Sequence, residues 1–245
     1  MNIPSLQIGN LKAKVPIIQG GMGVGISLSR LASAVANQGG IGIISGVQIG
    51  FNEPDFYNNT KEANIRALKK EIKNARRLSP KGILGVNFMV AMNNYDDMVK
   101  VAVEEKIDII ISGAGLPTHL PKLVKGSNTK IAPIVSSAKA AKIMCKLWDE
   151  KHSYVPDFIV VEGPNAGGHL GFKEDQLEIN KQPILKDLVK EVIDIIKPFS
   201  DKYKKVIPVI AAGGIYSGSD IAQMLNIGAS GVQMATRFIC TEECD

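Results

Sequence analysis

The sequence predicts a single α/β domain folded as a (β/α)8 barrel. Short apolar runs rich in Ile and Val alternate with longer segments whose apolar residues recur at helical spacing, and this alternation continues from residue 15 to residue 234. The length of 245 residues is one that α/β barrels commonly reach as one unit. A glycine fingerprint with the strand, helix and acidic residue of a dinucleotide-binding sheet is missing. The closed barrel is therefore favoured over an open, doubly wound sheet.

The predicted strands are apolar runs that end in glycine or in small polar residues. They span 15–19, 41–44, 82–88, 107–112, 131–135, 158–161, 206–210 and 231–234. Runs such as Phe158-Ile-Val-Val161 have the β-branched composition of strands that are buried on both faces, as the strands of a parallel barrel are.

The predicted helices follow these strands in turn. The first begins at Ser27, with Ser27 or Ser29 as its N-cap, and ends at the glycine pair 39–40. The later ones span 61–78, 95–105, 117–124, 137–149, 184–196 and 219–225. The polar stretch 45–61 reads as an insertion that could act as a lid over a site.

The overall composition excludes several classes of protein. Hydrophobic residues make up 45% and charged residues 22%, which excludes general disorder. The net charge of +5 comes from scattered lysines, so no nucleic-acid partner is expected, whereas an anionic cofactor or substrate would fit. No apolar run approaches the roughly 20 residues that a membrane-spanning helix needs, and the N-terminus has no leader pattern.

The three cysteines, Cys145, Cys240 and Cys244, form no disulfide framework and indicate a reducing compartment. We therefore expect a cytoplasmic protein without a membrane association. Cys240 and Cys244 are spaced as two metal ligands could be, but ordinary thiols are the preferred interpretation, and no metal site is predicted.

A histidine stands in the most glycine-rich stretch, Val161-Glu-Gly-Pro-Asn-Ala-Gly-Gly-His-Leu-Gly-Phe172. The glycines let the backbone approach a ligand closely, and the loop follows a buried strand. His169 is thus placed to exchange a proton near neutral pH. The alternative is a loop histidine that only makes hydrogen bonds to the backbone.

Two loops near the end of the chain predict a phosphate site. Gly213 and Gly214 follow the seventh strand, and Ala235, Thr236 and Arg237 follow the eighth, which is where barrels commonly hold a phosphate. The glycines would offer N–H groups to phosphate oxygens, while Thr236 would add a hydroxyl and Arg237 a charge. The alternative is that the glycine pair only forms a tight turn.

The first loop, Gly20-Gly-Met-Gly-Val-Gly25, is not a nucleotide-phosphate loop, because no lysine follows at the required place. Its glycines and the Met22 backbone could instead lie against a flat ring. A turn that merely leads into the helix is the other interpretation. In a barrel, loops that follow strands share one face, so residues far apart in sequence would converge there. These are Gly21, Asn87, Gly113, Ser136, His169, Gly213 and Met234.

Taken in order, these motifs resemble the nitronate monooxygenase (2-nitropropane dioxygenase) family of FMN-dependent barrels. The resemblance rests on Pro16–Met22, Gly85–Phe88, Ala166–Gly171, Ala211–Ile215 and Gln233–Phe238, and it covers nearly the whole chain. It implies that His169 is the catalytic histidine and that FMN is the cofactor. The FMN contacts that it implies are Gly21, Met22, Gly23, Asn87, Glu162, Gly167, Gly168, Gly213, Gly214, Gln233, Met234, Ala235 and Thr236.

The resemblance implies an oxidation of alkyl nitronates by dioxygen that yields carbonyl compounds and nitrite. Nitronate or nitroalkane and dioxygen would be the small-molecule partners, and a homo-oligomer is compatible with it. Flavin-dependent enoyl-acyl-carrier-protein reductases, which use NAD(P)H, share the same motifs and are the alternative. A non-catalytic flavin-binding or assembly subunit is a second one. Glu162 departs from the glutamine of many nitronate monooxygenases.

Members of this family normally continue through further outer helices beyond the eighth strand. The sequence ends at Asp245, so we expect those helices to be missing from the barrel and the outer face of the last strand to be exposed.

Overall fold

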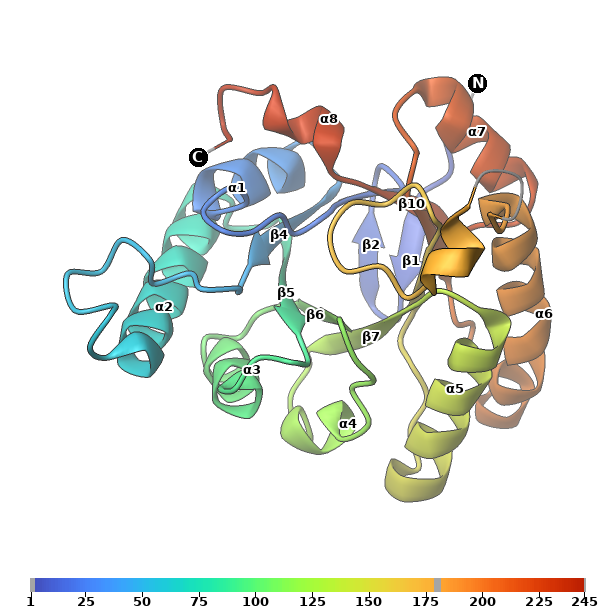
Figure 1. Cartoon of the computed structure of the whole chain (residues 1–245), viewed down its shortest axis with the longest axis horizontal. Coiled ribbons are helices and arrows are strands. Elements are labelled where there is room, and N and C mark those ends of the chain that lie inside the picture. Colours follow the sequence, from blue (N-terminus) through green and yellow to red (C-terminus); the bar gives the residue numbers. More distant parts are fainter. Residues whose placement is uncertain (1–2, 179–181, 245) are drawn as a thin grey trace.

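The computed structural model describes residues 3–178 and 182–244, and within them eight parallel strands close into a barrel (Figure 1). Neighbouring strands follow the order β10-β3-β4-β5-β6-β7-β8-β9, so each strand pairs with the next in the chain and β10 closes the ring against β3. This confirms the (β/α)8 prediction. The barrel strands are β3 (Ile17–Gln19), β4 (Ile41–Ser45), β5 (Ile83–Met89), β6 (Ile109–Gly113), β7 (Lys130–Val135), β8 (Ile159–Glu162), β9 (Val209–Ala212) and β10 (Gly231–Met234).

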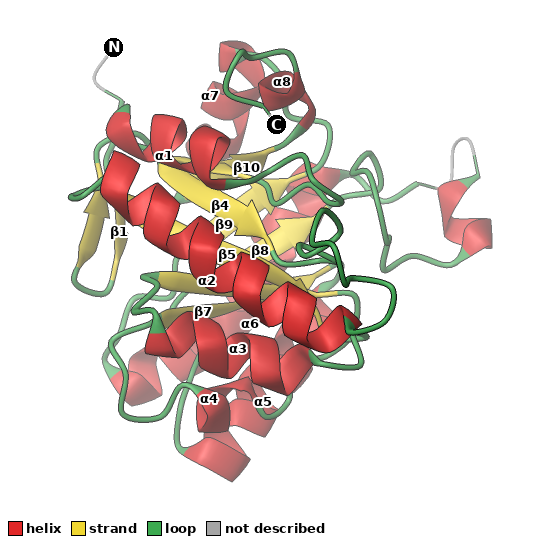
Figure 2. Ribbon diagram, turned by 90° about the vertical axis from the view of Figure 1, so that its left-hand side faces the viewer, coloured by secondary structure: helices red, strands yellow, loops and turns green. Residues whose placement is uncertain are grey.

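The helices lie around the outside of the barrel, between consecutive strands (Figure 2). They are α1 (Ser29–Asn37), α2 (Thr60–Leu78), α3 (Tyr95–Glu104), α4 (Leu120–Leu123), α5 (Ala138–His152), α6 (Leu185–Tyr203), α7 (Gly218–Asn226) and α8 (Thr236–Ile239). A 3-10 helix, η1 (Glu174–Leu177), stands in the loop between β8 and α6. No helix in the described ranges has both the length and the apolarity that crossing a membrane requires.

The apolar core forms two layers, because side chains of a strand alternate between its two faces. In β4, Ile41 and Ile43 belong to the cluster inside the barrel, whereas Ile44 belongs to the cluster between the barrel and the helices. All three are at most 1% exposed. Each such burial contributes about 1.5–3 kcal/mol to folding, so the barrel interior is a packed core and a ligand can enter only at a mouth.

A hairpin that the sequence interpretation missed closes the amino-terminal end of the barrel. Its strands β1 (Leu6–Ile8) and β2 (Leu11–Ala13) pair antiparallel, and Gly9 takes a positive φ of 57° at the turn. Leu6, Ile8 and Ala13 pack into the interior cluster. The hairpin therefore covers this end of the barrel interior, and the candidate site is the opposite mouth.

Two local predictions were wrong. Neither Ser27 nor Ser29 caps α1, whose N-cap residue is Leu28 without a side-chain hydrogen bond. The Ser27 hydroxyl instead accepts from the Met22 N–H at 3.0 Å and holds the first loop. Helix α6 was expected to stop near 196 but continues through Pro198 to Tyr203, because the last turns pack on the core and Tyr203 donates to Asp149 at 2.6 Å.

The stretch predicted as an insertion, 45–61, consists of hydrogen-bonded turns that are tied to α2. The Gly50 N–H donates to the Asn64 carbonyl oxygen Oδ1 at 2.8 Å, and the Arg66 guanidinium pairs with Glu53 at 3.1 Å and with Asp55. These contacts attach the stretch to a barrel helix, and its role as a lid stays a prediction.

Candidate active site at the carboxyl ends of the strands

The first glycine loop lies across the ends of β4 and β5. A Cβ atom added at Gly21 would stand 2.6 Å from the Asn87 Cβ and 3.3 Å from the Ile43 Cγ2, and one added at Gly23 would stand 2.8 Å from the Ser45 Oγ. Any side chain at these positions would have to displace its neighbours, so the glycines are needed for close approach. Asn87, on the inward face of β5, is the polar side chain that the loop reaches.

The conformation of this loop is fixed from below by Gln19, which is fully buried. Its side-chain amide donates to the Ser27 hydroxyl at 3.0 Å, while its carbonyl oxygen accepts from the Ile43 N–H at 3.0 Å. The Ser27 N–H also donates to the Met22 carbonyl oxygen at 3.0 Å. Gln19 was not predicted as a site residue, although a glutamine that ends an apolar strand was a readable signal.

The histidine loop and the glycine pair after β9 are packed together. A Cβ atom at Gly213 would stand 3.0 Å from the Gly163 carbonyl oxygen, and one at Gly214 would stand 3.0 Å from the Asn165 Cβ. Gly213 and Gly214 have φ values of 96° and 73°, which side chains disfavour. Two glycine loops that are fifty residues apart in sequence thus form one side of the mouth, as the convergence argument predicted.

The residues after β10 complete this side, but with a difference from the prediction. The Met234 carbonyl oxygen accepts from the Gly20 N–H at 2.7 Å, and a Cβ at Gly20 would stand 3.2 Å from the Ala235 Cβ. The Met234 side chain itself packs in the outer apolar cluster, so only its backbone can serve the mouth. Thr236 is the first residue of α8.

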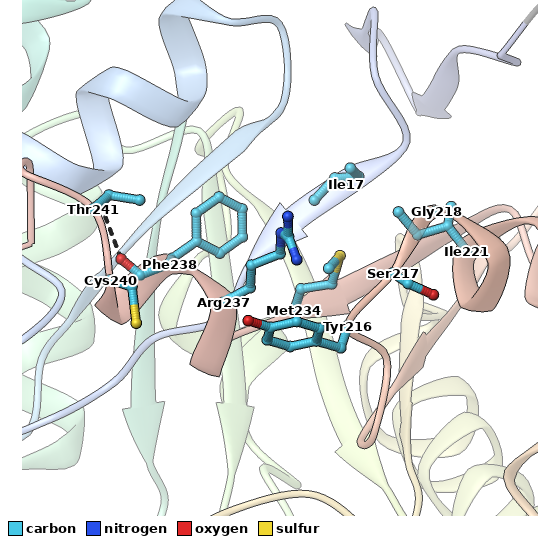
Figure 3. Close-up of a pocket in the computed structure, with 10 residues that line it drawn as sticks. All are labelled: Ile17, Tyr216, Ser217, Gly218, Ile221, Met234, Arg237, Phe238, Cys240 and Thr241. Carbon is cyan, nitrogen blue, oxygen red and sulfur yellow. Dashed lines mark hydrogen bonds between the residues drawn. The ribbon is translucent and has the colours of Figure 1, made fainter.

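Arg237, which the sequence offered as a phosphate charge, lies outside the barrel ring. Its guanidinium stands 4.8 Å from the centre of the Tyr216 ring, and both residues line a groove of about 600 Å³ beside β10 (Figure 3). Apolar Ile17, Ile221 and Phe238 line the same groove. A phosphate held by the mouth would therefore depend on backbone N–H groups and on Thr236.

The same groove tests the expectation that the last strand is exposed. Among the described residues α8 is only four residues long. The outward-facing Val232 and Met234 are nonetheless at most 5% exposed, so the strand itself is covered. The exposed apolar surface lies at Tyr216 and Ile239, which are 53% and 44% exposed.

His169 and the two glycines before it border open space. The histidine is exposed and makes no hydrogen bond or ion pair with any residue in the described ranges. A Cβ added at Gly167 or Gly168 would meet no atom within 4 Å. The alternative of a histidine that only bonds to the backbone has no support in these contacts, and the ring is accessible to a ligand.

Glu162 ends β8 at the inward face of the mouth, since Val160 two residues earlier belongs to the interior cluster. Its carboxyl group is half-buried and has no described hydrogen-bonding partner. Burial raises the pKa of Glu162 from its ordinary 4.5 to about 7. A large share of these carboxyl groups therefore holds a proton at neutral pH and can donate a hydrogen bond.

The mouth holds a buried polar atom that a ligand could pair with. The Gln233 Oε1 atom is buried and has no hydrogen-bond partner in the part of the chain that the structure describes. Unpaired buried polar atoms are rare and costly in folded proteins. This oxygen could accept a hydrogen bond from a bound flavin, and the uncovered glycines 167 and 168 leave space beside the histidine loop.

The family model described as nitronate monooxygenase matches residues 5–245. The chain belongs to the nitronate monooxygenase family. This confirms the resemblance drawn from the motifs and supports a flavin-dependent oxidoreductase.

Individual relatives are distant and longer. A (3aS,4S,5R,7aS)-5-hydroxy-7a-methyl-1-oxo-octahydro-1H-indene-4-carboxyl-CoA dehydrogenase from Rhodococcus jostii is 27% identical, over 93% of this chain and 53% of its own length. A probable nitronate monooxygenase from Staphylococcus aureus is 29% identical, over 95% and 67%. The solved structure of FabK from Thermotoga maritima superposes with a TM-score of 0.71 and 32% identity, over 94% and 60%. The chain thus spans about half to two thirds of the proteins it resembles.

Proposed function

We propose that this protein binds FMN at the barrel mouth and oxidises alkyl nitronates with dioxygen to carbonyl compounds and nitrite. The observation that supports the proposal is the packing of the loop that carries His169 against the glycine pair Gly213-Gly214, through contacts at Gly163 and Asn165. Membership in the nitronate monooxygenase family supports the same chemistry.

FMN, when bound, supplies the redox chemistry, and the chain supplies binding and orientation. The N–H groups of Gly213, Gly214 and Ala235, with the Thr236 hydroxyl, would hold the phosphate. Gly21, Met22, Gly23 and Asn87 would lie along the ring, where glycines permit contact. Gly167, Gly168, Glu162, Gln233 and the Met234 backbone complete the proposed contacts.

His169 is the proposed catalytic residue. As a neutral ring it would take a proton from the carbon beside the nitro group of a nitroalkane, and as a cation it would hold an anionic nitronate. A Glu162 that keeps its proton carries no charge, so it would not by itself favour the cationic ring. Replacing His169 with Asn should lower turnover by about 10²-fold or more while FMN content stays near that of the wild type. Complete loss of FMN would instead indicate a structural role.

Reduction of an enoyl thioester with NAD(P)H is the second candidate, because the same glycine and histidine motifs occur in the flavin-dependent enoyl reductases that the sequence resembles. The dehydrogenase from R. jostii, with 27% identity, adds an acyl-CoA substrate as a further variant of this class. A flavin-binding subunit without activity is the third. A single domain, a cytoplasmic location, a lid at 45–61 and a homo-oligomer remain proposals.

Anaerobic mixing separates these candidates. The FMN-loaded protein would be mixed with propyl-2-nitronate in one cell and with NADH or NADPH in another, while the flavin absorbance is followed. We expect the nitronate, but not the nicotinamide, to bleach the flavin. Admission of air should restore the flavin colour and release nitrite. Rapid bleaching by the nicotinamide without a response to nitronate would overturn the proposal in favour of the reductase. Intact FMN binding without either response would favour the inactive subunit.

A further inference from the structure

Ser45 is a polar residue at the mouth that neither the motifs nor the family resemblance assigned. It ends β4, and strand alternation puts it on the same inward face as Ile41 and Ile43. In the sheet it stands opposite Asn87 of β5. Ser45 therefore belongs to the wall of the mouth that lies beneath the first glycine loop.

The hydroxyl of Ser45 is buried and unpaired. The residue is 2% exposed, and its Oγ atom makes no hydrogen bond with any described residue. Its backbone is by contrast satisfied, since the Ser45 N–H donates to the Ser27 carbonyl oxygen at 2.9 Å. A buried hydroxyl without a partner destabilises the fold, so its position beneath the glycine loop, 2.8 Å from a Cβ added at Gly23, points to a partner that arrives with a ligand.

The position of Ser45 in the ring of strands indicates which part of the ligand it meets. The phosphate loops follow β9 and β10, and the strand order β9-β10-β3-β4 puts β4 two places from β10 and three from β9. Ser45 instead borders Gly23 of the loop assigned to the flat ring. The hydroxyl thus adjoins the loop assigned to the flat ring, whereas the phosphate loops follow strands two and three places away.

We propose that Ser45 is a further flavin-binding residue, whose hydroxyl hydrogen-bonds to the ring or ribityl portion of FMN. This inference rests on the proposed FMN binding and adds a contact to it. It gives Ser45 a binding role in place of a structural one, because the hydroxyl has no partner among the described residues and would find one in the flavin.

The test is the variant S45A, studied in the full chain. Flavin fluorescence titration of the cofactor-free protein should show FMN affinity weakened about 3- to 10-fold, the usual worth of one hydrogen bond. The affinity for riboflavin, which lacks the phosphate, should fall by the same factor. The cofactor-free variant should melt at the wild-type temperature or about 2–4 °C above it, because an unpaired polar atom has been removed.

Two other serines provide matched controls. Ser79 is also fully buried and unpaired among the described contacts, but it lies beside Gly82 at the other end of β5, so S79A should not change flavin affinity. Ser112 is buried and bonded to the Tyr95 hydroxyl at 2.9 Å, so S112A should lower the melting temperature and leave flavin affinity unchanged. S45C keeps a weak donor, so its FMN affinity should lie between those of wild type and S45A. It replaces S45A in the test if S45A does not fold.

Unchanged flavin affinity in S45A, or a lower melting temperature of the cofactor-free S45A, would overturn the inference. The second result would show that the hydroxyl already has a partner inside the protein. If S45A binds FMN more weakly than wild type but binds riboflavin equally well, the inference is also overturned, because the contact would then be to the phosphate. If wild-type protein binds neither flavin, the proposed function fails together with this inference, whereas binding by wild type with an unaltered S45A removes only the role of Ser45.

Discussion

Glu162 makes the stability of the cofactor-free protein depend on pH in a direction that can be worked out. Burial raises its pKa from 4.5 to about 7, so the folded chain holds this proton over a pH range in which the unfolded chain has lost it. The contribution of Glu162 is therefore most favourable below pH 4.5, declines as the pH rises toward 7, and is constant above that. E162Q cannot ionise, and its stability should not show this decline.

The size of this contribution of Glu162 to the free energy of unfolding follows from its two pKa values. A difference of 7 − 4.5 = 2.5 corresponds to at most about 3.4 kcal/mol at about 1.36 kcal/mol for each pH unit. Because the side chain is only partly buried, hydration reduces this to about 2 kcal/mol. Cofactor-free E162Q should thus equal the wild type near pH 4.5 and exceed it by about 2 kcal/mol above pH 7, or about 4–8 °C in melting temperature.

Urea denaturation of both proteins at several pH values between 4.5 and 8.5 measures this difference. The control is E62Q, which changes an exposed glutamate on α2 and should give a small difference that varies little across the range. A constant gap between E162Q and wild type at all pH values would refute the reasoning, as would a wild type that is more stable than E162Q at pH 8.

Three further substitutions test the geometry. In G21A the added methyl group would stand 2.6 Å from the Asn87 Cβ, so FMN affinity measured by fluorescence should fall about 10-fold or more as the loop shifts away from the ring. G213A forces a side chain at φ 96° and 3.0 Å from the Gly163 carbonyl oxygen, and urea unfolding should show a loss of about 1–3 kcal/mol. D157N weakens an ion pair of 2.7 Å between the buried Asp157 and the partly exposed Lys205, and should cost about 3 kcal/mol in the same assay without changing flavin affinity.

The order and class of the barrel elements could be predicted because each carries its own local pattern. The strand at 41–44 is an unbroken apolar run, and the helix at 61–78 repeats its apolar residues at helical spacing, so their periods are distinct. The hairpin of β1 and β2 was missed although Leu6 and Ile8 alternate with polar residues around a Gly-Asn turn. Three-residue strands are too short for their pattern to stand out without the packing that stabilises them.

The site could be located but not resolved in detail. Glycine loops at strand ends identified the mouth, because barrel topology brings such loops together wherever they stand in sequence. The direction of individual side chains could not be predicted. Met234 points outward because side chains alternate along β10, and Arg237 points outward because α8 turns away from the mouth. Ser45 was overlooked for a related reason, since being unpaired is a property of surroundings that the sequence does not display.

The unpaired polar atoms of the mouth lie next to the glycines of the first loop. Ser45 and Gln233 come from different strands, yet both adjoin the loop 20–25: a Cβ at Gly23 would stand 2.8 Å from the Ser45 Oγ and one at Gly20 would stand 3.6 Å from the Gln233 Cγ. Polar groups that are already aligned and dry bind a ligand without paying again for desolvation or ordering. The unpaired atoms lower the stability of the cofactor-free chain. Flavin binding should therefore raise the free energy of unfolding by more than it would in a protein whose polar atoms at the mouth are already paired with one another.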